Sequence, residues 1–161
     1  AGLGVLYLLH GLRRRDVSVI QDDPVFQGSS YLFTQKFRYD LRRWEQLSVT
    51  IQEHVMGRKK VTGKRISEAT LNMVTHAQKN RLVDQHDQPY ELLRQNMPWG
   101  SLREQGLFAM YFSHQPQHLV QWLKTRYHAD EQGDYDPLLD YMEAVANAAY
   151  FVPSIEFLQR S

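Results

Sequence analysis

The sequence of 161 residues contains no cysteine. Disulfide bonds, thiolate nucleophiles, Fe–S clusters and cysteine-bound zinc are therefore excluded within this chain. The lack of cysteine is also typical of proteins that work in a reducing compartment. We accordingly expect a cytoplasmic protein.

The sequence also lacks a strong excess of charge and a long hydrophobic run. The net charge of +1 gives no electrostatic reason to expect a nucleic-acid partner. The apolar opening, residues 1–12, is too short to cross a bilayer, and its basic residues follow the apolar stretch, the reverse of a signal peptide. We therefore expect neither nucleic acid nor membrane as a partner.

What the sequence contains is ordinary for a globular protein. Hydrophobic residues make up 42% and charged residues 23%, which indicates neither disorder nor a membrane protein. A chain of this length buries about two-thirds of the surface of its unfolded form. We expect a single domain over residues 1–161.

The first half of the chain predicts a strand followed by a helix. Residues 30–39 alternate, with mainly aromatic side chains on one side, which is typical of a half-buried strand. Asp40 is a suitable N-cap for a helix that ends at Gly57, and Ser48 could interrupt it and start a second piece. Residues 58–73 are polar and irregular, so we expect a long connection there.

The second half predicts two strands, two helices and a last strand. The strands are expected at residues 89–97, 107–112 and 148–152 and the helices from residue 116, with an apolar stripe of Leu119, Val120, Leu123 and Tyr127, and from 137 to 145. A break is expected at Pro98. The order predicts an α+β, ferredoxin-like split βαβ fold with an antiparallel four-stranded sheet and helices on one face.

Chemistry is concentrated in residues 74–100, where His76 precedes Arg94 and Asn96. A neutral imidazole is a good axial ligand for haem iron. Side chains two residues apart on an extended segment point the same way, so the guanidinium and the carboxamide could together stabilise negative charge on a bound small molecule. The residues alone leave other roles open: a structural histidine, a surface salt bridge for Arg94 and a turn for Asn96.

Two other groups of residues could carry chemistry. His114 and His118 are four residues apart and could share a helix face as metal ligands, but no third ligand accompanies them. The three tryptophans are expected mainly as core anchors, and an exposed one could carry an electron from a bulky substrate. They are Trp44, Trp99 and Trp122.

Five stretches, in order, resemble the dye-decolourising peroxidase family, most of all its bacterial B-type members. This family consists of haem enzymes built from two ferredoxin-like halves. The stretches are Gly28 to Lys60, THAQKN around His76, LLRQNMPWGSL (Leu92 to Leu102), GLFAMYF (Gly106 to Phe112) and AYFVPSIEFL (Ala149 to Leu158). The resemblance covers about residues 17–158 and corresponds to the C-terminal half of a family member.

The resemblance implies a role for five residues around a haem b. His76 would be the proximal ligand to the haem iron, and Arg94 would lie beside the peroxide site with Asn96 as the distal asparagine. Arg58, in the GRKK segment, would face a haem propionate. Asp140, in the LLDY segment, would accept a hydrogen bond from the other nitrogen of His76.

Two departures from the family pattern bear on function. The family's GxxDG motif, which supplies a distal aspartate, is not in this sequence, and His10 is the nearest counterpart in a loose alignment. A first ferredoxin-like half is also missing, and we expect the sheet face left open to make the chain a homo-oligomer.

The resemblance thus implies a haem peroxidase, or its C-terminal haem-binding half. It would reduce hydrogen peroxide and oxidise an organic electron donor. The alternative is a non-catalytic, ferredoxin-like haem-binding or assembly module.

Overall fold

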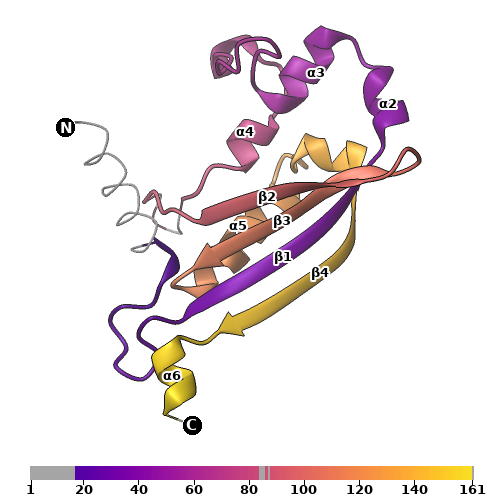
Figure 1. Cartoon of the computed structure of the whole chain (residues 1–161). Helices are drawn as coiled ribbons and strands as arrows, with labels where there is room; N and C mark the ends of the chain where they lie inside the picture. The colour runs from indigo at the N-terminus through magenta and orange to yellow at the C-terminus, as the bar shows by residue number, and fades with distance from the viewer. Residues whose placement is uncertain (1–16, 84–85, 87, 161) are drawn as a thin grey trace, which may run out of the picture.

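A computed structural model describes residues 17–83, 86 and 88–160 (Figure 1). His10 lies outside these residues. Four strands form one antiparallel sheet: β1 (Ser30–Tyr39), β2 (Leu93–Gly100), β3 (Gln105–Ser113) and β4 (Met142–Val152). Their order in the sheet, β2-β3-β1-β4, is that of a ferredoxin-like fold. The predicted fold class is confirmed.

The helices differ greatly in length. The structure has α2 (Leu41–Glu45), α3 (Val49–Met56), η1 (Glu68–Thr70), α4 (His76–Lys79), α5 (Pro116–Tyr127), η2 (Pro137–Tyr141) and α6 (Ile155–Gln159). In Figure 1, α5 lies behind the sheet, whereas α2, α3 and α4 stand above its β2 edge. No helix among the described residues is long and apolar enough to cross a bilayer.

The expected interruption of the first helix at Ser48 is confirmed. Ser48 caps α3 by accepting a hydrogen bond from the backbone of Ile51 at 3.3 Å, so α2 and α3 are separate helices. Gly57 ends α3 with a φ of 69°, a left-handed conformation that costs a glycine little. The connection over residues 58–73 contains only the short helix η1, as expected.

Several boundaries were predicted wrongly. Strand β2 begins at Leu93, not at residue 89. The helix expected over residues 137–145 stops at Tyr141, and β4 begins at Met142, which pairs with Tyr39 of β1. Pairing of ten β4 residues with β1 outweighs the local helical pattern. Strand β2 also continues through Pro98 to Gly100, because β2 is an edge strand and the missing N–H of a proline is tolerated there.

The hydrophobic core lies between the sheet and α5. Trp122 of α5 is 1% exposed, and Tyr111 of β3 packs against it with the ring centroids 4.1 Å apart. The buried face of α5 consists of Leu119, Trp122 and Arg126, whereas Val120, expected in the apolar stripe, is 51% exposed. The other buried members of the cluster are Phe37, Leu92 and Ala109.

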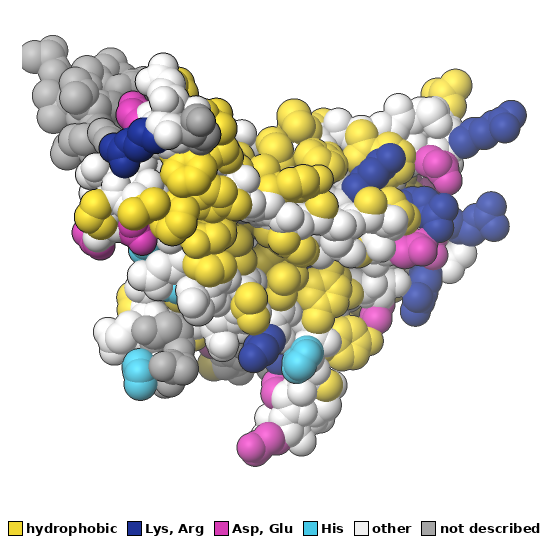
Figure 2. All heavy atoms as spheres, turned by 90° about the horizontal axis from the view of Figure 1, so that it is seen from below, with side chains coloured by type: hydrophobic (Ala, Val, Ile, Leu, Met, Phe, Trp, Pro, Cys, Tyr) yellow, Lys and Arg dark blue, Asp and Glu magenta, His cyan; other side chains and the backbone are white. Residues whose placement is uncertain are grey.

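The β4 edge of the sheet carries exposed apolar side chains. Figure 2 shows hydrophobic side chains gathered over the side of the molecule formed by β4 and α6. The exposed large hydrophobic residues there are Val145, Tyr150, Phe151, Ile155 and Leu158. Such a surface is a candidate for contact with another protein chain.

Candidate functional site

A cavity of about 280 Å³ lies between the sheet and the short helices. Its walls are mostly apolar, with a small number of polar groups, which is typical of a site for a small molecule or cofactor. The lining residues come from all four strands and from several helices: Phe37, Tyr39, Leu41, Trp44, Met56, His76, Asn80, Arg94, Asn96, Leu107, Tyr111, Arg126, Leu138, Tyr141 and Met142.

His76 is held at the first position of α4 by a capping box. The side chain of Thr75 accepts a hydrogen bond from the backbone of Gln78 at 3.2 Å, and the side chain of Gln78 accepts one from the backbone of Thr75 at 2.8 Å. These reciprocal bonds fix the start of a helix of only four residues. The capping box therefore fixes the backbone position of His76, whose side chain lines the cavity.

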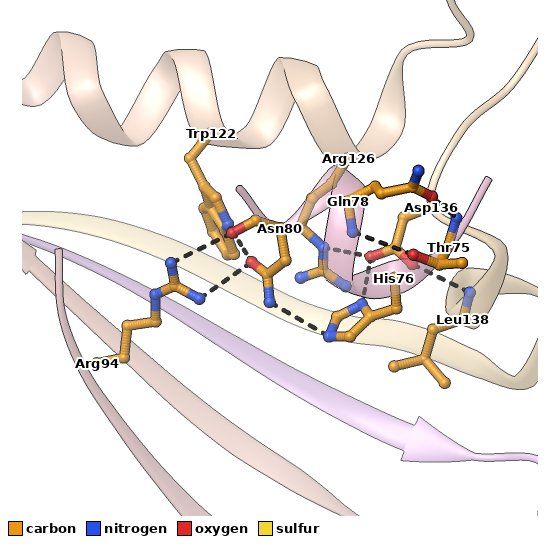
Figure 3. A network of polar contacts seen from close by, with 9 residues as sticks. All are labelled: Thr75, His76, Gln78, Asn80, Arg94, Trp122, Arg126, Asp136 and Leu138. Carbon is orange, nitrogen blue, oxygen red and sulfur yellow. Dashed lines mark hydrogen bonds and ion pairs between the residues drawn. The ribbon is translucent and has the colours of Figure 1, made fainter. Parts of the chain in front are cut away.

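The Nδ1 atom of His76 contacts a fully buried carboxylate. It lies 2.8 Å from Oδ2 of Asp136, which also accepts a hydrogen bond from Nε of Arg126 at 2.7 Å (Figure 3). Burial by itself raises the pKa of Asp136, but the hydrogen bond and charge of His76, with the charge of Arg126, outweigh burial. The pKa of Asp136 therefore lies below its ordinary value, and the carboxylate is ionised at neutral pH.

The prediction that Asp140 accepts this hydrogen bond is wrong. Asp140 is exposed, its carboxylate accepts from the hydroxyl of Tyr135 at 2.7 Å, and its backbone oxygen accepts from Arg43. The reason is the shape of η2. Asp136 is the N-cap of this short helix and is buried, and it also accepts from the backbone of Leu138 at 3.0 Å. Asp140 lies four residues later, within the helix, and is exposed.

Asn80 connects His76 with Arg94. Its Nδ2 atom is 3.2 Å from Nε2 of His76, while its Oδ1 atom accepts from Nη1 of Arg94 at 3.1 Å and from Nε1 of Trp122 at 2.8 Å. Figure 3 shows the resulting row of polar groups, which runs from Arg94 through Asn80 and His76 to Asp136 and Arg126. His76 and Arg94, which are predicted site residues, are thus bridged by the side chain of Asn80.

Arg94 and Asn96 both line the cavity from β2, so their expected position on one side of the strand is confirmed. Burial lowers the pKa of Arg94 from its ordinary value, and the nearby positive charge of Arg126 adds to this effect. A guanidinium nevertheless keeps its charge in proteins. Tyr111 pairs with Arg94 across the two strands, and burial raises the pKa of its hydroxyl, which therefore stays protonated.

Arg58, His114 and His118 lie away from this cavity. Arg58 is exposed, and its Nη1 atom donates to the backbone oxygen of Gly63 at 2.9 Å; its role toward a propionate stays a prediction. His114 Nδ1 lies 3.1 Å from the backbone oxygen of Val17, and His118 stacks on Tyr90. Within the described ranges no cluster of three or more His, Cys, Asp or Glu residues could hold a metal ion.

Comparison with known proteins identifies the family. The profile of the C-terminal part of the Dyp-type peroxidases matches residues 10–157. The chain belongs to the Dyp-type peroxidase family. It is 33% identical over 144 residues to a dye-decolorizing peroxidase of Rhodococcus erythropolis, covering 88% of this chain and 42% of that protein. A dye-decolorizing peroxidase of Mycobacterium tuberculosis is also 33% identical, covering 85% of this chain and 42% of that protein.

Solved structures of Dyp-type peroxidases share the fold. A putative Dyp-type peroxidase from Shewanella oneidensis has a TM-score of 0.86 and 31% identity, over 92% of this chain and 49% of that one. A variant of DypB from Rhodococcus jostii RHA1, solved in complex with heme, has a TM-score of 0.83 and 31% identity, over 91% and 48%. This chain therefore spans less than half the length of these Dyp-type relatives.

Sequence reasoning missed three polar residues of the site in this Dyp-type chain: Asn80, Arg126 and Asp136. Asp136 precedes a proline that begins a predicted helix, and this position indicates an N-cap rather than a partner for a histidine. Asn80 follows His76 by one helical turn, so recognising the capping box at Thr75 and Gln78 would have placed both on the same side of α4.

Proposed function

We propose that this chain forms the haem-binding part of a peroxidase that reduces hydrogen peroxide and oxidises an organic donor. The observation that carries the proposal is the contact of 2.8 Å between His76 and the buried Asp136 at the wall of an apolar cavity. A histidine that ligates a metal typically donates its other ring N–H to a carboxylate, which fixes its tautomer and raises its basicity.

The residues of the cavity fit a haem b. The apolar walls suit a flat macrocycle, and Nε2 of His76 carries the lone pair for iron because Asp136 favours the ring proton on Nδ1. Binding would require Asn80 to release Nε2, which it contacts at 3.2 Å. The cationic side chain of Arg94 also lines the cavity, and its charge favours an anionic group in this site.

When bound, the haem iron would supply the electrons that break the O–O bond of peroxide and recover them from the donor. Arg94 would stabilise the negative charge that develops on the departing oxygen, since its guanidinium remains charged and is held in place by Asn80. Asn96, two residues along the same strand, would orient peroxide or water with its amide. Asp136 would hold the ring of His76 through Nδ1.

One observation favours the alternative, a haem-binding module without turnover. Among the described residues no Asp or Glu lines the cavity, so no carboxylate there is placed to move the peroxide proton. General acid–base groups contribute about 10²–10⁴-fold to rates. A slow reaction would therefore be expected of this chain by itself, and a complete absence of reaction would indicate the module.

The test is the rate of peroxide-dependent dye oxidation by the haem-loaded chain. Arg94→Leu should lower kcat by about 10²–10³-fold, the usual effect of losing one such electrostatic group. Arg103→Leu, in the exposed turn between β2 and β3, is the control and should retain the parental rate. If the parent binds haem but shows no peroxide-dependent oxidation, the non-catalytic module is the better description.

We also propose that the chain forms a homo-oligomer. The exposed apolar side chains of β4 and α6, including Tyr150 at 53% and Ile155 at 70% exposure, support this proposal. Light scattering with Ile155→Asp as the comparison tests it. A monomeric parent at high concentration would contradict it.

A further inference from the structure

Arg126 is a buried cation that the proposed chemistry does not use. Its side chain is 3% exposed and lies near the aromatic rings of Phe37, Trp122 and Tyr127, at 5.8, 5.2 and 5.7 Å from their centroids. Aromatic contacts alone compensate only part of the cost of burying a charge. A charged partner is supplied by Asp136, whose Oδ2 atom accepts from Nε of Arg126 at 2.7 Å.

Arg126 and His76 share a single oxygen atom. Oδ2 of Asp136 accepts from Arg126 at 2.7 Å and lies 2.8 Å from Nδ1 of His76, whereas Oδ1 accepts from the backbone of Leu138 (Figure 3). Two donors on one oxygen compete for its electron density. The carboxylate therefore attracts the Nδ1 proton of His76 less strongly than a carboxylate without Arg126 would.

The backbone makes this arrangement rigid. The N–H of Asp136 donates to the backbone oxygen of Arg126 at 3.0 Å, so the last turn of α5 and the start of η2 are joined twice. Arg126 thus fixes the position of the Asp136 carboxylate and favours its ionised form. Neither effect needs Arg126 to touch a substrate.

We propose that Arg126 is a positioning residue that weakens the hydrogen bond from Nδ1 of His76 to Asp136. It thereby raises the reduction potential of iron bound at Nε2. This inference rests on the proposed function. A stronger hydrogen bond from Nδ1 gives the ligand more anionic character, which favours oxidised iron. By competing for Oδ2, Arg126 opposes this effect and makes the reduced iron easier to reach.

The first experiment needs no haem. The Nδ1 proton of His76, measured by NMR in the cofactor-free chain, reports the strength of its hydrogen bond to Asp136. Arg126→Gln, which removes the charge, should move this resonance downfield because the bond to Asp136 becomes stronger. Arg126→Lys keeps the charge and should restore much of the parental position. An unchanged resonance in Arg126→Gln would overturn the inference, whatever the outcome for haem binding.

The second experiment uses the haem-loaded chain and two readouts. Arg126→Gln should lower the ferric/ferrous midpoint potential and raise the frequency of the Fe–His stretching vibration, and Asp136→Asn should shift both in the opposite directions. A merely structural loss would loosen the ligand and would not raise that frequency. A shifted potential with an unchanged vibration would mean that Arg126 acts only through space, and the inference would fail.

Failure of the proposed function gives a different result. In that case the parental chain would show no histidine-ligated haem spectrum at all, although the NMR resonance of His76 would still respond to Arg126→Gln. The effect of Arg126 on iron would then be excluded together with the proposed function. If the parent shows a histidine-ligated haem but its Fe–His stretching frequency is the same in Arg126→Gln, only the further inference would be excluded.

Discussion

His76 and Asp136 are sixty residues apart in the sequence, and Nδ1 of the first lies 2.8 Å from Oδ2 of the second. This contact joins α4 to the start of η2 beside the cavity. Because Asp136 is fully buried and also pairs with the buried Arg126, the contact affects stability as well as the site. Removing the Asp136 carboxylate should therefore be measurable in unfolding experiments.

Asp136→Ala should destabilise the chain by about 3–5 kcal/mol, because it leaves the buried guanidinium of Arg126 without its partner. Urea unfolding followed by circular dichroism measures the change. Asp140→Ala is the matched control: this carboxylate is exposed, so the loss should stay within about 0.5 kcal/mol. Equal losses in the two variants would show that the Asp136 pair has no special role.

Gly57→Ala should disturb the start of α4. A Cβ atom at Gly57 would lie 2.7 Å from Oγ1 of Thr75, the residue that caps α4 before His76, and the φ of 69° is strained for alanine. Gly63 has nearly the same φ, 67°, with nothing within 4 Å of an added Cβ. Thermal unfolding should show about 1–2 kcal/mol lost in Gly63→Ala and more in Gly57→Ala. The reverse order would contradict the packing described for Gly57.

Asn80→Ala should cost about 1–3 kcal/mol, because Nε1 of Trp122 and Nη1 of Arg94 lose their shared acceptor in a partly buried site. Asn96→Ala removes the same side chain from an exposed position on β2 and should cost no more than about 0.5 kcal/mol. Chemical denaturation of the two variants makes the comparison. A neutral Asn80→Ala would mean that this polar row does not stabilise the fold.

Acid should weaken the contact between α4 and the loop after α5. The hydrogen bond from Lys79, followed by backbone hydrogen bonds, lowers the pKa of Asp130. Since the folded pKa lies below the ordinary value of about 3.9, this stabilisation is complete above about pH 4 and is lost as the pH falls through the folded pKa. Unfolding curves at several pH values should show a shallower acid loss in Asp130→Asn, and parallel curves for parent and variant would refute the effect.

The fold was predictable because most elements carry a local signal. The alternation over residues 30–39 matches β1, and Asp40, Ser48 and Gly57 all lie at helix ends, as their residue types predict. The errors arose where sheet pairing decides the outcome. Register against β1 extends β4 back to Met142, and local sequence contains no information on that register.

The site was predictable only for residues with distinctive chemistry. His76, Arg94 and Asn96 all line the cavity, as the sequence indicated. The prediction named Asp140 instead of Asp136. Asp136 is the N-cap of η2 and Asp140 lies within the same short helix, so only the structure shows which carboxylate is buried. Arg126 was missed because a lone arginine in a helix is ordinarily a surface residue.

The most direct measurement is an absorption titration of the purified chain with haemin, repeated for His76→Ala. His54→Ala, which removes a half-buried histidine of α3 outside the cavity lining, serves as the control. The account predicts a sharp Soret band that saturates near one haem per chain, persists in His54→Ala and is lost or weakened in His76→Ala. A broad band that does not saturate, or one that His76→Ala leaves unchanged, would contradict it.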